Sequence, residues 1–464
     1  MMFPLVEQIP FKDPFEYFRV VAEQPFAMFL DSSLQHPTLG RYSYIAFDPF
    51  LTLISKDKQI QIGCDEREGD PLEEIARLLE QYPLETRLEG TPFQGGMLGY
   101  IGYDAAHHIE RLPSARFDDL RFQDIALGCY DVVLGFDLSE QKSWIFSSGF
   151  PEKNEKTRLQ RAQERLQFAL SLLFEGMEKP FERSEAVIPQ TAIQSPFNRA
   201  MYCDGVKQCI EYILAGDIFE GTLSQRFIAP MPAITPFQLY ERSRRFNPAP
   251  FSAYLNFPEQ VIASASPERF LKLKAGQVET RPIKGTVRRS TDLAEDHILA
   301  NQLQRSEKDR AENIMIVDLM RNDLSRVCED HSVKVPQLCG LESYATVHHL
   351  VSVVEGRLKA DQDAVTLLRA TFPGGSVTGA PKIRAMEIIA ELEPTARGPY
   401  CGSIGYIGFN GDMDTSIVIR TFAIKDDKVT FQVGGAITAD SDPASEYDES
   451  LVKAAAMIRT LTEY

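Results

Sequence analysis

Strand-like segments that follow one another without intervening helices are the feature that most restricts the fold of this chain. Residues 261–286 alternate apolar and polar side chains around a turn at Gly276. Residues 400–438 continue as hairpins that turn at Asn410-Gly411 and Asp426-Asp427, pairs that favour tight turns. Strands in runs, rather than in strict β-α-β alternation, favour large antiparallel sheets. The sequence therefore predicts an α+β fold.

Helical spacing of apolar residues appears between these strand runs. A stripe from Leu159 to Leu173 predicts an amphipathic helix. Ser195-Pro196 predicts the N-cap and first turn of another helix, which ends at Gly216. Residues 291–326 predict two more helices, and the segment 130–136 is interpreted as a strand.

The domain boundary is predicted in residues 179–194, which are mostly polar and lack periodicity. We therefore expect an N-terminal region at 1–185 and a second region at 195–464. The two are expected to intertwine in one unit.

Charge and composition exclude several classes of partner. The 464 residues carry a formal charge of 49 − 66 = −17, which repels nucleic acid and anionic membranes. No segment is long and apolar enough to span a bilayer, and the seven cysteines form no CxxC pair. We expect a reduced, cytoplasmic protein that binds neither nucleic acid nor membrane.

Lys284 is the most informative single residue. The alternation of residues 277–281 breaks at Gly285, which predicts a strand ending in a tight turn with the lysine at the rim of a cleft. A lysine is a nucleophile only when its amine is neutral, so its pKa has to fall below the ordinary value of about 10.4. Taken alone, a lysine is more often a solvated surface residue.

Glutamates supply the other candidate groups. Glu268 precedes Lys284 by 284 − 268 = 16 residues, a spacing that a strand pair turning near Gly276 would close. A buried glutamate of raised pKa is a suitable proton donor. Glu446 and Glu449 are neighbours on one predicted helical face, and Glu312 lies beside an apolar stripe on another. Carboxylate oxygens suit Mg²⁺, although Glu446 and Glu449 alone also fit a solvated acidic face.

Ordered blocks of residues resemble the signature of the chorismate-utilising enzymes, which include anthranilate, isochorismate, salicylate and aminodeoxychorismate synthases. The blocks are Ser266-Pro-Glu-Arg-Phe270, Arg281-Pro-Ile-Lys-Gly-Thr286, Glu312 to Asp323, Val347-His-His-Leu350, Phe372 to Lys382, and Ile419-Arg-Thr421, with looser matches at Leu30-Asp-Ser32, Gly40-Arg-Tyr-Ser43 and Gly95 to Tyr100. The resemblance implies antiparallel sheets packed as a sandwich, with helices outside.

A lysine at position 284 resembles the aminodeoxychorismate synthase branch, because the anthranilate and isochorismate branches have alanine there. The resemblance implies that Lys284 adds covalently to C2 of chorismate while Glu268 protonates the leaving C4 hydroxyl. Ammonia then adds at C4 and expels the lysine, giving 4-amino-4-deoxychorismate on the route to p-aminobenzoate and folate. Covalent catalysis of this kind divides one difficult displacement into two easier steps.

The resemblance also assigns the remaining site residues. Glu312 and Glu449 resemble direct Mg²⁺ ligands, and Glu446 reaches the ion directly or through water. Arg420 resembles a carboxylate clamp. Other implied substrate contacts are Gly285, Thr286, His349, Thr378, Tyr400, Gly434, Gly435 and Lys453. An N-terminal pocket similar to one that holds tryptophan in some relatives is implied at Ser32, Arg41, Tyr42, Pro250, Phe251 and Ser252.

Two positions depart from the family pattern. Glu220 stands where the aminating enzymes commonly have glutamine, and Ala436 stands where a third glycine is more usual. Because the sequence contains no glutaminase motif, the resemblance implies a separate glutamine amidotransferase as the source of ammonia. An anthranilate synthase component I and a non-catalytic chorismate-binding subunit remain the alternatives.

Overall fold

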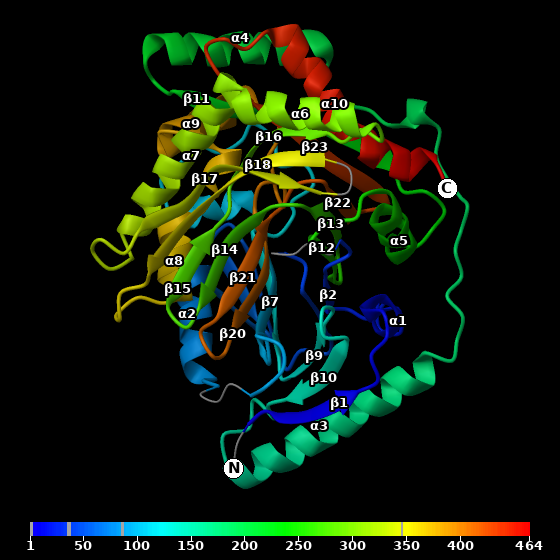
Figure 1. The fold of residues 1–464 in the computed structure, drawn as a ribbon. Coiled ribbons are helices and arrows are strands. Elements are labelled where there is room, and N and C mark those ends of the chain that lie inside the picture. Colours follow the sequence, from blue (N-terminus) through cyan, green and yellow to red (C-terminus); the bar gives the residue numbers. More distant parts are fainter. Residues whose placement is uncertain (1–2, 35–38, 85–87, 345–346) are drawn as a thin grey trace.

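Two large antiparallel sheets form the protein (Figure 1). The computed structural model describes residues 3–34, 39–84, 88–344 and 347–464. Every ladder between its named strands is antiparallel. The α+β prediction is confirmed.

Within the described residues, the first sheet has eleven strands. In spatial order they are β1 (Leu5–Ile9), β10 (Lys142–Ser147), β9 (Val132–Asp137), β3 (Tyr42–Ala46), β2 (Ala27–Asp31), β12 (Phe251–Asn256), β13 (Val261–Ser266), β22 (Thr421–Lys425), β23 (Lys428–Ile437), β11 (Glu220–Pro230) and β19 (Gly379–Ala380).

The second sheet has twelve strands in the part of the chain that the structure describes. Its strands are β16 (Ile283–Arg288), β18 (Val347–Arg357), β15 (Gln277–Thr280), β14 (Arg269–Lys274), β21 (Met413–Ile417), β20 (Ser403–Gly408), β7 (Gly96–Ile101), β8 (Ile125–Tyr130), β4 (Leu51–Lys56), β5 (Gln59–Ile62) and β6 (Asp65–Glu68), with β17 (Lys334–Ser343) paired to β18. Both sheets contain strands from before residue 180 and after residue 195, so the two halves of the chain build one framework.

A shared core joins the sheets. Met28, Tyr44 and Leu255 of the first sheet pack in one buried cluster with Leu98 and Tyr406 of the second. Phe93 stacks on Tyr406 with ring centroids 4.4 Å apart. This apolar interior makes the two sheets a sandwich.

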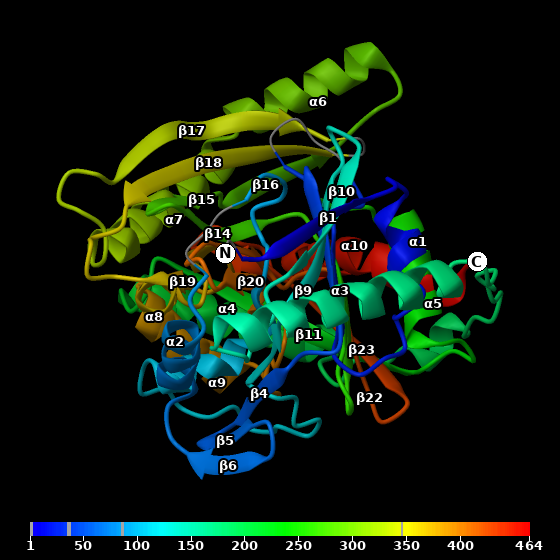
Figure 2. The ribbon, with the colours of Figure 1, turned by 90° about the horizontal axis from the view of Figure 1, so that it is seen from below.

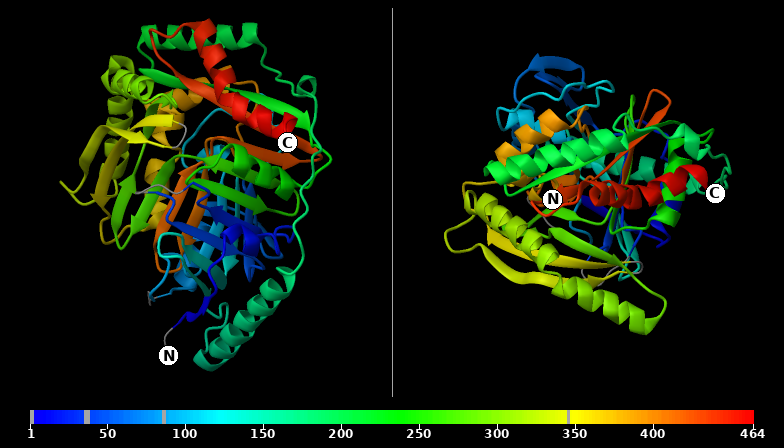
Figure 3. Two further views of the ribbon diagram at one scale, coloured as in Figure 1. Left: turned by 45° about the vertical axis from the view of Figure 1, so that its right-hand side comes forward. Right: turned by 90° about the horizontal axis from the view of Figure 1, so that it is seen from above.

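Helices cover the outside of the sandwich (Figures 1 and 3). They are α1 (Pro14–Phe18), α2 (Pro71–Gln81), α3 (Glu155–Gly176), α4 (Arg199–Ala215), α5 (Pro236–Phe246), α6 (Leu293–Arg305), α7 (Glu307–Ser325), α8 (Ala364–Thr371), α9 (Lys382–Leu392) and α10 (Pro443–Thr462). Figure 2 shows α3 lying along β1, β9 and β10. None of the helices in the described ranges is long and apolar enough to cross a membrane.

Most predicted elements are present, with local corrections. The stripe on α3 buries Ala162, Leu166, Ala169 and Leu173 as expected. Residues 179–194 run along the outside with only a short 3-10 helix at Gln190–Ala192 (Figure 1). Helix α4 begins later than predicted, because Asn198 rather than Ser195 caps it through a bond to Met201 N.

The segment 130–136 is not one strand, contrary to the prediction. Asp131 separates β8 in the second sheet from β9 in the first. Its buried carboxylate accepts a hydrogen bond from Arg165 Nε of α3 at 3.1 Å. The chain therefore crosses between sheets at this residue, and similar crossings recur in the functional site.

Candidate active site

Two further crossings between the sheets position Glu268 and Arg420. Residues 267–268 link β13 to β14, and residues 418–420 link β21 to β22. The links lie side by side, because Ala265 N donates to Arg420 O at 3.1 Å and Ile417 N donates to Glu268 O at 3.0 Å. The predicted acid and the predicted clamp are thus held by one set of backbone hydrogen bonds.

Glu268 has the environment of a proton donor. Its Oε1 accepts a hydrogen bond from Ser376 Oγ at 2.7 Å and a longer one from Ile283 N at 3.4 Å. Burial raises the pKa of Glu268 to about 7, although these bonds and the charges of Lys284 and Arg420 oppose the rise. A carboxyl group of this pKa is protonated for much of the time near neutral pH.

Lys284 lies within strand β16 and not after a strand end, which corrects the sequence prediction. The pairing of β16 with β18 shifts register between Ile283 and Thr286, a bulge in which Gly285 takes φ +82°. A Cβ on Gly285 would also lie 3.0 Å from Asp309 of α7. The bulge turns Lys284 inward, where only 9% of its surface is exposed, so it is buried and not at a rim.

The Lys284 amine donates to Glu220 Oε1 at 2.6 Å. Burial alone lowers the pKa of Lys284, but the charges of Glu220 and Glu312 and this hydrogen bond leave it above the ordinary value. A lowered pKa of Lys284 was predicted from the sequence, and that prediction is wrong for the resting protein. The chemical reason is that Glu220, 64 residues earlier, supplies a full negative charge at hydrogen-bond distance.

Arg420 is only partly buried, and unlike the buried cations Lys284 and Arg397 its guanidinium has no hydrogen-bond or ion-pair partner among the described residues. Its φ of 51° lies in the left-handed region, which costs a non-glycine residue about 1–2 kcal/mol. Burial lowers its pKa. An unpaired, strained arginine suits a carboxylate ligand that arrives from outside.

His349 of β18 faces Thr286 of β16, and 2.7 Å separates its Nδ1 from Thr286 Oγ1. Burial lowers the pKa of His349 to about 3, and the Arg420 charge adds to the effect. The imidazole is therefore neutral and acts as a hydrogen-bonding group, not as a cation.

The three predicted metal ligands approach one another from two helices. Glu312 belongs to α7, while Glu446 and Glu449 belong to α10. Burial raises the pKa of Glu312 to about 7. Lys308 Nζ lies 4.0 Å from Glu312 Oε1 and 3.7 Å from Glu446 Oε1, so a cation already stands between two of the acids.

The donor set fits Mg²⁺ in chemistry but is not closed. No group of three or more His, Cys, Asp or Glu side chains in the described part of the chain is spaced to hold a metal ion. All three donors are carboxylates, and the position between Glu312 and Glu446 already holds the Lys308 ammonium. A divalent ion would replace that ammonium and draw the acids together.

Glycines in β23 bring α10 close to the sheet. A Cβ on Gly434 would lie 2.3 Å from Leu223 O, and one on Gly435 would lie 3.3 Å from Glu446 Oε2 and 3.9 Å from Glu449 Oε1. Lys453 Nζ bonds Gly434 O and Glu449 Oε1, both at 2.9 Å. Ala436 lies one residue beyond, opposite Thr222 of β11.

Thr378 and Tyr400 stand at the other wall of the site. Thr378 is fully buried, and its hydroxyl donates to Gly374 O at 3.1 Å. Tyr400 is half-buried, with the Arg397 guanidinium 5.7 Å from its ring centroid.

A buried ion pair that the sequence reasoning missed organises this wall. Arg397 and Glu393, one turn apart and 2.7 Å from each other, are both almost fully buried. Arg397 donates to Val377 O and Thr222 O, and Glu393 accepts from Ser224 N. Ser376, which holds Glu268, was also missed, although it lies in the glycine-rich block 372–382. The four-residue spacing of Glu393 and Arg397 was the available signal for the pair.

Comparisons with known proteins agree with this geometry. The sequence profile of the chorismate binding enzyme family matches residues 27–459. The chain is 41% identical to aminodeoxychorismate synthase component 1 of Salmonella typhimurium over 446 residues, 94% of this chain and 93% of that protein. The chain belongs to the chorismate-binding enzyme family.

Other members of that family are nearly as similar. Anthranilate synthase component 1 of Thermus thermophilus is 38% identical over 95% of this chain and 93% of its own length. The crystal structure of anthranilate synthase component I from Streptococcus pneumoniae has a TM-score of 0.81 and 32% identity, covering 92% of this chain and 93% of that one. The protein is a chorismate-utilising enzyme of the aminodeoxychorismate and anthranilate synthase component I type.

A cavity of about 480 Å³ lies between the two sheets of this chorismate-binding enzyme. The residues predicted for the effector pocket all line it: Ser32, Arg41, Tyr42, Pro250, Phe251 and Ser252. Arg269, Asp414 and Tyr406 line the opposite side, from the second sheet. Its assignment to a tryptophan-like effector stays a prediction.

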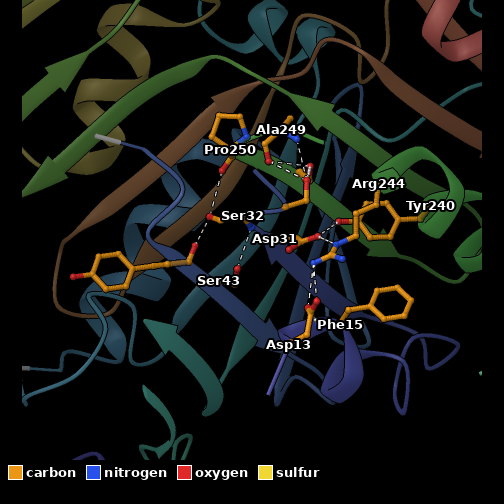
Figure 4. A network of polar contacts seen from close by, with 12 residues as sticks. Asp13, Phe15, Asp31, Ser32, Ser43, Tyr240, Arg244, Ala249 and Pro250 are labelled. Carbon is orange, nitrogen blue, oxygen red and sulfur yellow. Dashed lines mark hydrogen bonds and ion pairs between the residues drawn. The ribbon is translucent and has the colours of Figure 1, made fainter. Parts of the chain in front are cut away.

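The polar groups of this pocket are already bonded to one another (Figure 4). Ser32 Oγ donates to Tyr42 O at 2.6 Å. Asp31 accepts hydrogen bonds from Tyr240 Oη at 2.8 Å and from Arg244 Nε at 2.7 Å. Arg244 also bonds Asp13 at 3.1 Å, so the network extends from the pocket to α1.

Proposed function

We propose that the enzyme aminates chorismate at C4, giving 4-amino-4-deoxychorismate. The observation that carries the proposal is the buried amine of Lys284. The preceding residue, Ile283, donates its N–H to the carboxyl group of Glu268, so the candidate nucleophile and the candidate acid are neighbours. Relatives named aminodeoxychorismate synthase component 1, at 38–41% identity, support the same activity.

The proposed reaction has two displacements. The Lys284 amine forms a bond to C2 of the ring, electrons shift through the ring double bonds, and the C4–O bond breaks. Glu268 gives its proton to the departing hydroxyl, which leaves as water. Ammonia then bonds to C4, the electrons shift back, and the C2–N bond breaks to free Lys284. The new C4 ammonium group loses one proton, which restores the acid form of Glu268. The net change is chorismate plus ammonia to the amino product plus water.

The charged groups around this centre hold the substrate in the proposed scheme. Arg420, which lacks a protein partner, takes a substrate carboxylate in a bidentate bond. Glu312, Glu446 and Glu449 are the residues that would hold Mg²⁺, which when bound neutralises a ring carboxylate and withdraws electron density. Thr378, Tyr400, neutral His349 and the backbone of Gly434 and Gly435 orient the ring.

Ammonia is proposed to come from a separate glutamine amidotransferase. The designation "component 1" in the relatives implies a second component. With free ammonium salt in place of that partner, the chain should be a slower but complete catalyst.

The product identifies the reaction. Purified protein with chorismate, Mg²⁺ and an ammonium salt is expected to form 4-amino-4-deoxychorismate without releasing pyruvate, as measured by mass spectrometry. Anthranilate together with pyruvate would instead show the alternative that the Thermus thermophilus relative represents.

The nucleophile is tested by Lys284→Arg and Lys284→Ala. Both variants are expected to lose amination by several powers of ten, on the order of 10³-fold or more, because neither offers a usable amine. The arginine variant distinguishes a covalent from an electrostatic role of Lys284, because it keeps the positive charge but offers no nucleophilic amine. Amination by Lys284→Arg near the wild-type rate would leave only an electrostatic role for the lysine.

A further inference from the structure

The contact between Glu220 and Lys284 joins the two sheets of the sandwich. Glu220 begins β11 in the first sheet, and Lys284 lies on β16 at the edge of the second. Glu220 has no exposed surface, and its strand position is fixed by pairing with Ala380 of β19. The 2.6 Å bond between Lys284 Nζ and Glu220 Oε1 is thus held by rigid backbone on both sides.

This pair has spare bonding capacity on both members. Glu220 Oε2 is buried and has no hydrogen-bond partner among the described residues. Lys284 Nζ donates one hydrogen bond, of 2.6 Å to Glu220 Oε1, and forms no second one within the described ranges. Charge pairing holds the pKa of Lys284 above its ordinary value, but the unpaired Glu220 Oε2 and the unused Lys284 N–H groups still carry a desolvation cost in the buried site. Moving one proton from nitrogen to oxygen makes both groups neutral and removes that cost.

The other charged groups near the pair are less suited to take the proton. Glu268 is bonded to Ser376 and Ile283 N and is needed as an acid. The charge of Glu312 raises the pKa of Lys284, and the charge of Lys284 lowers the pKa of Glu449. Neither carboxylate forms an ion pair with Lys284 in the described structure. Arg420 is a cation, and the Cys209 thiol of α4 is already protonated, because burial raises its pKa to about 12.

We propose that Glu220 is the proton acceptor that converts Lys284 into a nucleophile and later returns the same proton. This inference rests on the proposed amination. Before attack, one N–H bond of the Lys284 ammonium breaks, and the proton bonds to the Glu220 carboxylate. The freed lone pair forms the bond to C2. When the C2–N bond breaks in the second displacement, its electron pair returns to nitrogen, which takes the proton back from Glu220. The pair ends as it began, and no other reactant is consumed.

If Glu220 takes the proton, the amination rate does not depend on loss of a proton from Lys284 to bulk water. In the wild type, the pair holds one proton in either form, so attack needs no hydroxide. In Glu220→Gln, which keeps the shape of the side chain, the amine has to lose its proton to solvent. The ratio of variant to wild-type amination rate is therefore expected to rise about tenfold per pH unit until Lys284 is deprotonated. Taking the ratio cancels the pH dependence of Glu268 and of free ammonia.

The pH at which Lys284 becomes deprotonated can be measured without an activity assay. Carbamoylation of Lys284 by cyanate, followed by peptide mass spectrometry, gives the pH at which its amine becomes neutral in each protein. In Glu220→Gln, amination and carbamoylation are expected to rise together. In the wild type, amination is expected to show no such rise, because the proton passes to Glu220 and not to solvent. Glu355→Gln, an exposed carboxylate on the neighbouring strand β18, serves as the control and should give a flat ratio.

A purely electrostatic role for Glu220 predicts the opposite sign. Removing the negative charge would then leave more neutral amine, so Glu220→Gln would aminate at neutral pH as fast as the wild type or faster. That result would overturn the proposal, as would a ratio of variant to wild-type amination rate that does not change with pH. Lys284→Ala separates the two proposals: retained amination in that variant defeats both, whereas lost amination with a fast Glu220→Gln defeats only the role of Glu220.

Discussion

Arg269 and Arg420 lie close to the same junction between the sheets but have opposite surroundings. Arg269 is 8% exposed and bonds Asp414 at 3.0 Å and Glu279 at 2.8 Å, beside the 480 Å³ pocket. Arg420, in the active site, has no partner in the described ranges and a left-handed backbone. The guanidinium of Arg269 is fully paired with protein carboxylates, whereas that of Arg420 is left without a protein partner in the described ranges.

The acids of the two regions differ in the same way. Asp31 at the pocket is bonded to a cation, Arg244, and to Tyr240. Glu268 in the active site is bonded only to neutral donors, and burial raises its pKa to about 7. Charges paired within the protein hold its shape, while charges left unpaired in a buried place are available to a substrate. Chemistry is therefore expected in the active site and not in the 480 Å³ pocket, where Asp31 and Arg269 are paired within the protein.

The largest effect is expected from Glu268→Gln. Losing a general acid should lower kcat about 10²–10⁴-fold. The acid form is the working one, so in the wild type its contribution is full below about pH 7 and is lost as the pH rises through the pKa of about 7. A kcat–pH profile at saturating ammonia is expected to lose this alkaline limb in the variant. A limb that persists in Glu268→Gln would assign it to another group.

Arg269→Gln and Arg420→Gln form a matched pair. Breaking the buried Arg269 ion pairs should lower the free energy of unfolding by about 3–5 kcal/mol, as measured in urea. Arg420→Gln should not lower it, because the charge that is removed is partly buried and has no ion-pair partner in the described ranges. Conversely, kcat/KM is expected to fall about 10- to 100-fold for Arg420→Gln and little for Arg269→Gln. Equal stability losses in the two variants would break the comparison.

The smallest expected effect concerns Glu449. Glu449→Gln should raise the Mg²⁺ concentration for half-maximal rate by about tenfold, because one of few charged ligands is lost. Asp448→Asn is the control, since Asp448 is the preceding residue and pairs with Arg199 on the surface. Identical Mg²⁺ titrations for the two variants would favour a solvated acidic helix face.

Local patterns predicted much of the fold. The hairpin turn at Asn410-Gly411 depends on φ +82° at the glycine, and the turn at Asp426-Asp427 places both residues at positive φ. The two helices in 291–326 follow from local spacing and from the caps Asp292 and Ser306. Such elements are decided by residues near in sequence, so a sequence argument reaches them.

The rest depended on contacts distant in sequence. Nothing in the apolar run around Asp131 distinguishes a continuous strand from a crossing between sheets, because both faces are buried either way. Glu220 was recognised as unusual, but its ion pair with Lys284 depends on how β11 and β16 meet. For that reason the direction of the Lys284 pKa shift was predicted wrongly, while the burial and raised pKa of Glu268 agreed with expectation.

The two crossings at Glu268 and Arg420 have a mechanical consequence. Backbone hydrogen bonds tie these crossings together, so sliding one sheet over the other carries the acid and the clamp along as one piece. The Glu220–Lys284 contact has no such tie, since its members belong to different sheets. A small shear between the layers would stretch that contact first. The distance between the Lys284 amine and the Glu220 carboxylate is therefore sensitive to any ligand that shifts one sheet relative to the other.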